Sequence, residues 1–268
     1  MFPGASADRS AADYVVVGAP LDVSTTFQPG TRFGPDRVRR YARSYEDYDR
    51  RTDARFSTLA VHDAGDVRAW DDAPDYVDYL SGALGDVVRD DAVPLLLGGE
   101  HTVTVAGVDA VSPDLFVCLD AHLDLRREFD GNEWSHATVT RRALDAADRA
   151  VVVGARTGSE AEWARADDDD VTVVPPERVR EWLADPPAFD GSVYLSVDVD
   201  AADPGFAPGT GTVEPFGLTP RELRDVVRAV APHADGFDVV EVNDRDDGQA
   251  AALGAKLLRE FVFSHADA

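Results

Sequence analysis

The sequence is poor in cysteine, in lysine and in long apolar runs, and each scarcity argues against a class of protein. Cys118 is the one cysteine among 268 residues, so no intrachain disulfide can form. Its apolar neighbours predict an inert position in the core. No stretch of about 18 apolar residues is present, which argues against a membrane span, and the N-terminus lacks the basic and apolar segments of a secretory signal. We therefore expect a soluble cytoplasmic protein.

Positive charge is also scarce. Lysine and arginine together number 26 against 51 aspartates and glutamates, which gives a formal net charge of −25, and Lys256 is the one lysine. Such a field repels phosphates and anionic lipids, so we expect no nucleic-acid partner and no membrane partner. Excess acid along the whole chain, with arginine in place of lysine, indicates a halophile, because molar salt shortens the Debye length to about 3 Å and screens self-repulsion.

The remaining composition is that of a folded α/β protein. Hydrophobic residues make up 44% of the chain and charged residues 29%, so the chain can form a buried core. Short runs rich in β-branched residues alternate with helical segments, and each run is continuously apolar, as in parallel strands buried on both faces. These runs cover residues 14–17, 58–61, 94–97, 115–119, 150–153, 171–174, 193–197 and 237–240.

Two of the intervening segments carry clear helix signals. Apolar residues between Tyr76 and Val88 recur on one helical stripe. Thr219-Pro220-Arg221-Glu222 supplies an N-cap, a proline at the first helical position and an acid at the third. The alternation predicts one domain over residues 1–268, although the length alone would permit two, with a three-layer α/β/α fold around a roughly eight-stranded parallel sheet. Ligands of such folds bind beyond the carboxyl ends of the strands.

Three of the predicted strands end in residue types that bind metals. Gly98-Gly99-Glu100-His101 follows one strand, Asp120-Ala121-His122-Leu123-Asp124 follows another, and Ser196-Val197-Asp198-Val199-Asp200 ends a third. The candidate ligands are His101, Asp120, His122, Asp124, Asp198 and Asp200. Residues i and i+2 of an extended segment face the same side, so the side chains of each motif begin on one face.

These two imidazoles and four carboxylates carry too much negative charge to cluster without a cation. They exceed what one zinc ion needs, whereas an oxygen-rich set with histidine suits manganese. Two ions roughly 3.5–4 Å apart, bridged by two of the carboxylates, would use all six ligands. Each motif alone has a simpler explanation: a chance spacing, a turn that opens a helix, or a calcium or magnesium site. The three together favour a binuclear site.

Further motifs occur in order along nearly the whole chain. They are Gly18-Ala19-Pro20-Leu21-Asp22, Pro29-Gly30-Thr31-Arg32-Phe33-Gly34-Pro35, Ser135-His136-Ala137-Thr138, Ala207-Pro208-Gly209-Thr210-Gly211-Thr212 and Val240-Glu241-Val242-Asn243. With the metal-ligand segments, this set resembles the ureohydrolase (arginase/agmatinase) family, and most closely its archaeal-type agmatinases. The resemblance implies an eight-stranded parallel α/β/α fold, a binuclear manganese hydrolase of guanidines, and a homo-oligomer that is a trimer or a hexamer.

The resemblance also assigns roles position by position. It implies one manganese ion on His101, Asp120, Asp124 and Asp198, and a second on Asp120, His122, Asp198 and Asp200. The two shared carboxylates would bridge the ions. Glu241 matches the glutamate that pairs with the guanidinium, and His136 matches a histidine that shuttles protons. Collapse of the tetrahedral intermediate needs a proton on the leaving amine, and Asp124 is the candidate donor.

Residues 125–134 bear on the tail of the substrate. The acids of this segment are Glu128, Asp130 and Glu133, and its bases are Arg126 and Arg127. The acids favour a cationic tail, as in agmatine, which hydrolysis converts to putrescine and urea. The arginines could instead meet a carboxylate, so arginine and guanidinobutyrate stay open as substrates. A non-catalytic metal-binding scaffold is the alternative of another class, and it would lack a ligand or the substrate-pairing glutamate.

Salt dependence tests the halophile prediction. We expect the free energy of unfolding to rise between dilute buffer and molar KCl, because salt screens the repulsion among the acidic side chains. Urea denaturation at both salt concentrations measures the change. An unfolding free energy that stays flat over this range would remove the inference.

Overall fold

A parallel sheet forms the middle layer of the protein, whose computed structural model describes residues 1–243 and 245–268. The sheet has eight strands in the order β4-β1-β5-β10-β9-β6-β7-β8, and neighbouring strands run parallel. The strands are β1 (Tyr14–Ala19), β4 (Val61–Asp66), β5 (Val93–Gly98), β6 (Leu115–Leu119), β7 (Arg149–Val153), β8 (Val171–Val174), β9 (Val193–Asp198) and β10 (Ala234–Val240). A small antiparallel pair joins β2 (Tyr48–Asp49) to β3 (Ala54–Arg55).

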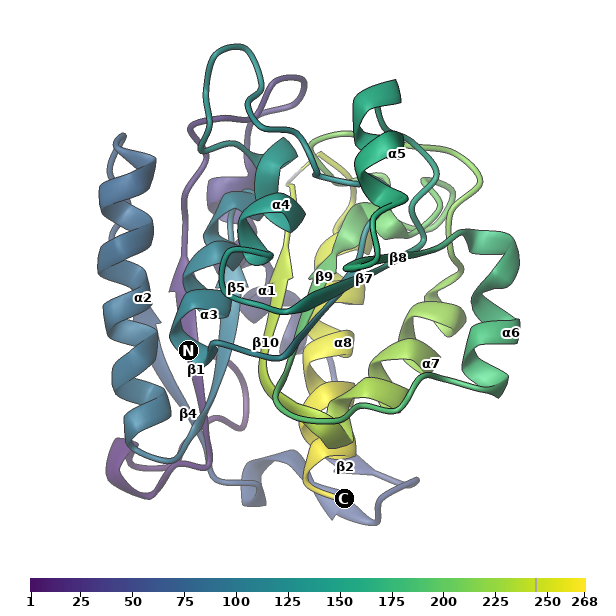
Figure 1. The fold of residues 1–268 in the computed structure, drawn as a ribbon. Helices are drawn as coiled ribbons and strands as arrows, with labels where there is room; N and C mark the ends of the chain where they lie inside the picture. Colours follow the sequence, from purple (N-terminus) through teal and green to yellow (C-terminus); the bar gives the residue numbers. More distant parts are fainter. Residues whose placement is uncertain (244) are drawn as a thin grey trace.

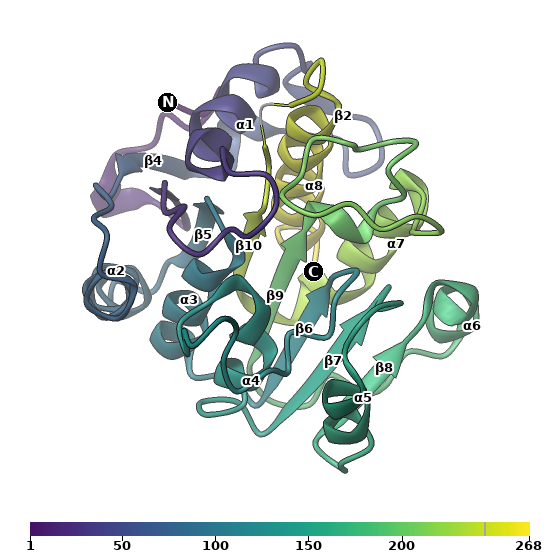
Figure 2. The ribbon, with the colours of Figure 1, turned by 90° about the horizontal axis from the view of Figure 1, so that it is seen from above.

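Helices cover both faces of the sheet (Figures 1 and 2). They are α1 (Gly34–Ala42), α2 (Ala73–Arg89), α3 (Thr104–Val111), α4 (Val139–Ala143), α5 (Glu160–Ala166), α6 (Val179–Ala184), α7 (Pro220–Val230) and α8 (Gln249–His265). On one face α8 packs between α1 and α7, and α6 packs on α7, whereas α3 packs between α2 and α4 on the other. The predicted three-layer α/β/α fold with an eight-stranded parallel sheet is confirmed. Within the described residues, no helix is both long and apolar enough to span a bilayer.

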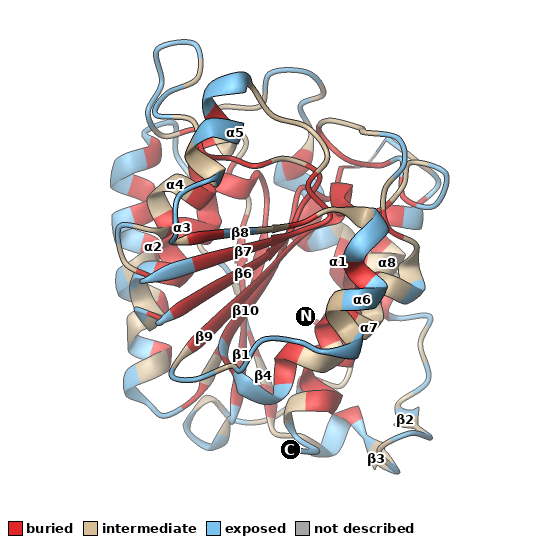
Figure 3. Cartoon of the chain, turned by 45° about the vertical axis from the view of Figure 1, so that its right-hand side comes forward, coloured by how far each residue is buried: buried red, intermediate tan, exposed pale blue. Residues whose placement is uncertain are grey.

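The inner strands are buried along their length, as Figure 3 shows. Every residue of β1, β6 and β9 is buried. Because helices cover both faces, neither face of these strands meets water, and their apolar runs show no alternation. The sequence pattern located these strands for this reason.

The predicted strand at residues 58–61 is wrong in position. The chain forms a short 3-10 turn at Phe56–Thr58, and β4 runs instead from Val61 to Asp66. Ala60 has a φ of 50°, a left-handed conformation that turns the chain just before the strand. As an edge strand, β4 tolerates polar residues, so its sequence lacks the apolar run that marks the inner strands.

Both predicted helix signals are confirmed. The Thr219 hydroxyl accepts the backbone N–H of Glu222, whose carboxylate in turn accepts the N–H of Thr219, so α7 begins with a reciprocal cap. The stripe of α2 buries Tyr76, Leu80 and other apolar side chains against the sheet. Burial of such side chains contributes about 1.5–3 kcal/mol each.

The strand order brings the metal-binding motifs together. β5, β10, β9 and β6 are consecutive neighbours in the middle of the sheet. Since all run parallel, the segments that follow them leave the sheet at one edge. His101 follows β5, Asp120 follows β6, Asp198 ends β9 and Glu241 follows β10. Residues more than a hundred positions apart in the sequence are thus brought to one small area at the edge of the sheet.

Gly99 lies at this edge of the sheet, where the chain segments that follow β1, β5 and β10 approach one another closely. Its N–H donates to the carbonyl of Ala19 at 2.8 Å, and its carbonyl accepts the N–H of Glu241 at 2.8 Å. A Cβ atom at position 99 would lie 1.9 Å from the carbonyl oxygen of Leu21. That oxygen is fixed in place, because it accepts the N–H of Glu100 at 2.8 Å. Only glycine permits this close backbone approach.

Replacing this glycine tests the crossing. We expect Gly99→Ala to destabilise the protein by about 1–3 kcal/mol, because the backbone of the adjoining loop must move. Gly82→Ala is the matched control, since a Cβ there meets no atom within 4 Å and alanine favours the exposed interior of α2 by up to about 1 kcal/mol. Chemical denaturation measures both variants, and equal midpoints would contradict the account.

Candidate active site

The candidate ligands converge around two imidazoles at the carboxyl edge of the sheet. The Nδ1 atom of His101 lies 3.1 Å from Asp120 Oδ2, 3.1 Å from Asp124 Oδ2 and 3.5 Å from Asp198 Oδ2. All four side chains are buried. The end of β9 and the segments that follow β5 and β6 therefore present one nitrogen and three carboxylates to the same point.

The second imidazole shares one carboxylate with the first. His122 Nδ1 lies 3.0 Å from Asp200 Oδ2 and 3.4 Å from Asp120 Oδ1. Asp120 thus turns one oxygen to each imidazole, as a carboxylate between two ions would. Asp198, the other expected bridge, turns Oδ2 to His101, and its Oδ1 accepts the N–H of Asp200 at 2.8 Å.

The chemistry of this donor set fits metal ions. The Nδ1 atom of His101 is buried without a hydrogen bond, although three carboxylate oxygens surround it. Burial, followed by the charge of Asp120, raises the pKa of Asp124 to about 7. Burial, together with the charges of Asp200 and Asp120, raises the pKa of Asp198 well above its usual value. A divalent cation would accept the imidazole lone pair and keep the carboxylates ionised.

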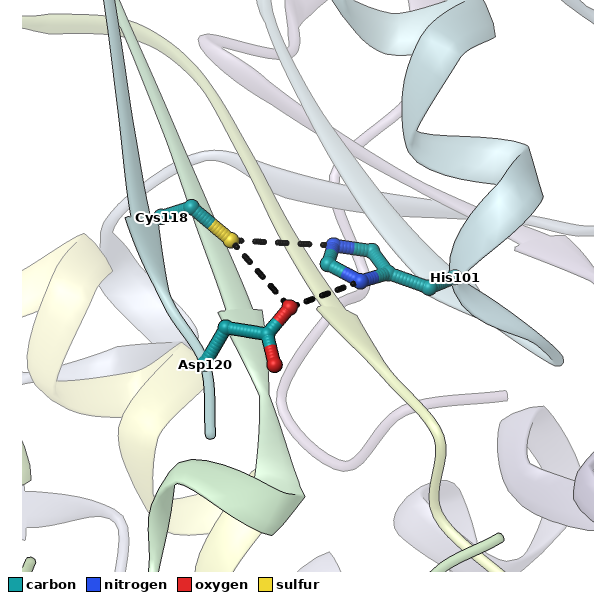
Figure 4. A group of neighbouring side chains, drawn as sticks. All are labelled: His101, Cys118 and Asp120. Carbon is teal, nitrogen blue, oxygen red and sulfur yellow. Dashed lines mark hydrogen bonds and ion pairs between the residues drawn. The ribbon is translucent and has the colours of Figure 1, made fainter. Parts of the chain in front are cut away.

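Two sets of donor atoms lie close enough to share an ion. One set is Asp120, His122 and Asp200, and the other is His101, Cys118 and Asp120 (Figure 4). Cys118 Sγ lies 3.7 Å from His101 Nε2 and 3.9 Å from Asp120 Oδ2. Cys118 is buried, as its sequence context predicts, and burial raises the pKa of its thiol, which keeps it protonated and a poor ligand. Its contact with His101 was not predicted, although residues 118 and 120 share one side of the extended segment.

Two residues of this cluster have strained backbones. Asp124 has a φ of 52° and Glu241 a φ of 60°, in the left-handed region that favours glycine. Such conformations cost on the order of 1–3 kcal/mol each and persist where the surroundings fix them. The carbonyl of Asp124 accepts the N–H of Arg141 at 3.1 Å, and the N–H of Glu241 donates to Gly99. The strain aims both carboxylates into the same cavity.

This cavity has a volume of about 280 Å³ and lies over the candidate ligands. Glu241 lines it, and its Oε1 atom accepts the backbone N–H of His101 at 2.8 Å. A Cβ atom at Gly211 would lie 2.6 Å from Oε2, so the missing side chain leaves room beside that oxygen. Burial raises the pKa of Glu241 to about 8. A cation bound in the cavity would therefore be needed to keep Glu241 ionised at neutral pH.

His136 lines the same cavity from the segment before α4. Its Nδ1 atom lies 3.2 Å from Ser24 Oγ, and its backbone N–H donates to that oxygen at 3.0 Å. The ring of Phe129 meets the imidazole edge-on, with 5.9 Å between ring centroids. Burial, followed by the charge of His122, lowers the pKa of His136 to about 4. The imidazole is therefore neutral near pH 7.

Comparison with known proteins decides the family. The family model described as Arginase matches residues 12–264. The chain belongs to the arginase family. Its sequence is 33% identical over 261 residues to an agmatinase of Pyrococcus horikoshii, covering 94% of this chain and 91% of the relative. It is 33% identical over 258 residues to an N(1)-aminopropylagmatine ureohydrolase of Thermococcus kodakarensis, covering 92% and 88%.

A solved structure of the arginase family agrees over almost the whole fold. The agmatine ureohydrolase of Thermoplasma volcanium matches with a TM-score of 0.92 at 32% identity, covering 99% of this chain and 94% of that one. The ureohydrolase resemblance is therefore confirmed as family membership. The halophilic source of the chain stays a prediction.

In this arginase-family chain, the role of Glu100 could not be predicted from the sequence. Its buried carboxylate accepts the N–H groups of Val23 and Ser24 at 2.6 and 2.7 Å, and the Ser24 hydroxyl at 2.8 Å. Ser24 Oγ in turn accepts the N–H of His136. Glu100 thus fixes the loop on which His136 rests. Glu100 belongs to the motif Gly98-Gly99-Glu100-His101, in which only His101 was a candidate ligand.

Arg156 is a second residue without a signal in the sequence. Its guanidinium donates to backbone carbonyls of three segments, those of Gly154 at 3.0 Å, Asp200 at 2.9 Å and Glu214 at 2.7 Å. It therefore ties the segment after β9, which carries Asp200, to the segment after β7 and to residues near 214. Hydrogen bonds to carbonyls depend on the path of the backbone, which a single sequence does not reveal.

The acids of residues 125–134, which the sequence predicts to favour a cationic tail, do not line the substrate cavity. Glu128, Asp130 and Glu133 are exposed and lie outside its lining. Phe129 and Asn132 exchange backbone hydrogen bonds of 2.9 Å in each direction. This tight turn reverses the chain and directs the acids to solvent.

Two other residues of this segment, Arg126 and Phe129, line the cavity instead. The guanidinium carbon of Arg126 lies 4.9 Å from the centroid of the Phe129 ring. Its Nε donates to Glu162 Oε2 at 3.1 Å, and Glu162 also lines the cavity. The lining of the cavity therefore includes the aromatic ring of Phe129 and, beside it, an arginine whose charge is already paired with Glu162.

Asp198→Ala tests the shared role of this carboxylate. We expect the variant to lose bound metal and activity together, because one carboxylate would serve two ions. Metal analysis after dialysis measures the loss. Asp203→Asn is the control, since Asp203 lies nearby but holds the loop N–H groups of Gly205 and Phe216. Near-normal metal content in Asp198→Ala would refute the bridging role.

Proposed function

We propose that the chain is a binuclear manganese agmatinase, which hydrolyses agmatine to putrescine and urea. The observation that carries the proposal is one cavity lined by Glu241 and by five of the six candidate ligands, with the sixth, Asp120, beside His101 and His122. The relatives support agmatine as the substrate, because the Pyrococcus horikoshii protein is an agmatinase and the Thermoplasma volcanium structure is an agmatine ureohydrolase. Membership of the arginase family supports the reaction class, the hydrolysis of a linear amidine C–N bond.

The metal ligands are proposed as the sequence assigns them. One ion would bind His101, Asp120, Asp124 and Asp198, and the other Asp120, His122, Asp198 and Asp200. Manganese is favoured because carboxylate oxygens outnumber imidazoles and burial raises the pKa of the one nearby thiol, Cys118. When bound, the two ions would supply the Lewis acidity that ionises water near neutral pH.

Glu241 is proposed to hold the guanidinium of the substrate. The backbone N–H of His101 fixes Oε1, and Oε2 faces the space beside Gly211. A carboxylate held in this way can accept two charge-assisted bonds from a planar guanidinium. The pairing places the guanidinium carbon against the candidate ligands and replaces a bimolecular encounter with a fixed geometry.

Two residues are proposed to manage protons. Asp124 lines the cavity and would carry a proton to the leaving amine, which cannot depart as an anion. His136 also lines the cavity, is neutral near pH 7, and would exchange protons with solvent. Glu100 and Ser24 would keep that imidazole in place.

The setting of the enzyme follows from the same observations. We propose one catalytic domain over residues 1–268, since all eight strands of the main sheet join one array. A cytoplasmic location in a halophile is supported by the net charge of −25 and the single lysine. A homo-oligomer, either a trimer or a hexamer, is proposed from the family resemblance alone.

Arginine and guanidinobutyrate are the second candidates within the same chemistry. Arg126 lines the cavity and could meet a substrate carboxylate. Its pairing with Glu162 lowers that attraction, and the apolar face of Phe129 suits the methylene chain of agmatine. A non-catalytic scaffold has no support, because every predicted ligand and Glu241 are present in one cluster.

Urea release tests the proposed function directly. The protein is loaded with manganese in molar KCl and assayed with agmatine, arginine and guanidinobutyrate side by side. Urea from agmatine alone is the expected result. Urea mainly from arginine or guanidinobutyrate would keep the reaction class and overturn the substrate. Two bound ions without urea from any guanidine would overturn the enzymatic assignment.

Glu241→Gln tests the guanidinium pairing. We expect kcat/KM for agmatine to fall at least roughly 30-fold, because a buried charge partner of the substrate is lost. Bound manganese should stay normal, since Glu241 is not among the proposed ligands. Glu214→Gln, in a nearby loop, is the matched control with unchanged kinetics. An unchanged kcat/KM for Glu241→Gln would exclude the pairing.

A further inference from the structure

A buried carboxylate in the middle of the sheet has no role in the chemistry above. Asp238 lies inside β10 among apolar residues and is fully buried. Within the described chain it forms no ion pair with lysine or arginine. It accepts the hydroxyl of Tyr194 at 2.9 Å and the hydroxyl of Ser196 at 2.6 Å. Burying a carboxylate without an ion pair costs free energy of folding. We therefore infer that Asp238 contributes to function.

The register of the sheet connects Asp238 to the candidate metal cluster. Ser196 of β9 pairs with Asp238 of β10 on one side and with Cys118 of β6 on the other. His101 lies over this row, with Nε2 at 3.3 Å from Ser196 Oγ and 3.7 Å from Cys118 Sγ. The opposite nitrogen, Nδ1, faces the carboxylates of Asp120 and Asp124.

The direction of the hydrogen bonds follows from the chemistry of the groups. A carboxylate can only accept, so the single hydroxyl proton of Ser196 goes to Asp238. The lone pair of Ser196 Oγ is then left for His101, and Nε2 must carry a proton to use it. Thr104 Oγ1, at 3.5 Å from Ser196 Oγ, is too distant to compete strongly. When the imidazole of His101 carries a single proton, as a metal ligand does, that proton is thereby held on Nε2, and Nδ1 faces the carboxylates.

The fold makes room for this arrangement. Tyr194 and Ser196 are alternate residues of β9, so both side chains point to the same face of the sheet. A Cβ atom at Gly107 would lie 2.0 Å from the Tyr194 hydroxyl, and one at Gly236 would lie 2.7 Å from its ring. The absence of side chains at Gly107 and Gly236 thus leaves room for the phenol of Tyr194, which donates a hydrogen bond to the second carboxylate oxygen of Asp238.

We propose that Tyr194, Asp238 and Ser196 form a relay that positions His101 as a metal ligand, by fixing the proton on Nε2 and leaving Nδ1 free. The relay rests on the metal centre proposed above. The three are positioning residues, because none of them lines the substrate cavity. His122 has no such relay in the described chain, and its side chain is partly exposed. The relay therefore acts on one of the two ions.

Asp238→Asn is the main test. The amide can donate to Ser196, which would then donate its own proton to His101 Nε2 and favour the tautomer that cannot bind metal through Nδ1. We expect the Mn²⁺ affinity of one ion to fall about 10–100-fold while the other ion binds normally. Titration calorimetry of the folded variant with Mn²⁺ resolves the two steps.

A control and a second variant keep the test decisive. Asp235→Asn changes a carboxylate of the same strand that accepts only the N–H of Val193, and it should bind Mn²⁺ normally. Ser196→Ala breaks the link to His101 without altering the Asp238–Tyr194 bond. It should weaken the same ion, and it decides the question if Asp238→Asn does not fold. In ¹⁵N NMR of the zinc-loaded protein, the Nε2–H proton of His101 should exchange faster with water in Ser196→Ala.

The outcomes separate this proposal from the proposed function. Normal Mn²⁺ affinities and Nε2–H exchange in folded Asp238→Asn and Ser196→Ala, with only a lowered melting temperature, would make the trio merely structural and overturn the relay. Wild-type protein that binds no Mn²⁺ would overturn the metal centre and the relay together. Neither readout uses a substrate, so the identity of the guanidine does not affect the result.

Discussion

Repulsion among buried carboxylates is the constraint on which the rest of this structure depends. Asp120, Asp124, Asp198 and Asp200 gather around two imidazoles at one edge of the sheet. Carboxylates so close together and so far from water cannot all ionise unless protons or cations compensate them. The protein brings them together nonetheless, and it maintains two left-handed residues there. Metal ions bound at this site would supply the compensating charge.

The sheet supplies the rigidity that such a cluster needs. Four neighbouring parallel strands deliver the ligands and Glu241 to one edge, and close backbone crossings such as that at Gly99 hold the segments in register. Around them lie polar groups that do not line the cavity. Glu100 fixes the loop beneath His136, and Arg156 fixes the segment of Asp200. The geometry of the cavity is thus set largely by residues outside it.

Much of the fold and of the candidate site could be predicted from the sequence. The inner strands were recognisable as apolar runs because both of their faces are covered. The candidate ligands were recognisable because each lies at the end of such a run or just after it. The edge strand β4 was misplaced because exposure removes that pattern. That the acids near Glu128 lie outside the cavity was not predictable, because a tight turn between Phe129 and Asn132 sets their direction. The link from Asp238 to His101 was invisible because it depends on the register between β9 and β10.

The most direct test of the central claim is electron paramagnetic resonance of the manganese-loaded protein, with the bound metal counted on the same sample. If the carboxylates share two ions, the spectrum will be that of a spin-coupled pair, with two manganese ions for each chain. A spectrum of isolated manganese ions, with one or none for each chain, would contradict the account. The cluster of carboxylates would then need another source of compensating charge.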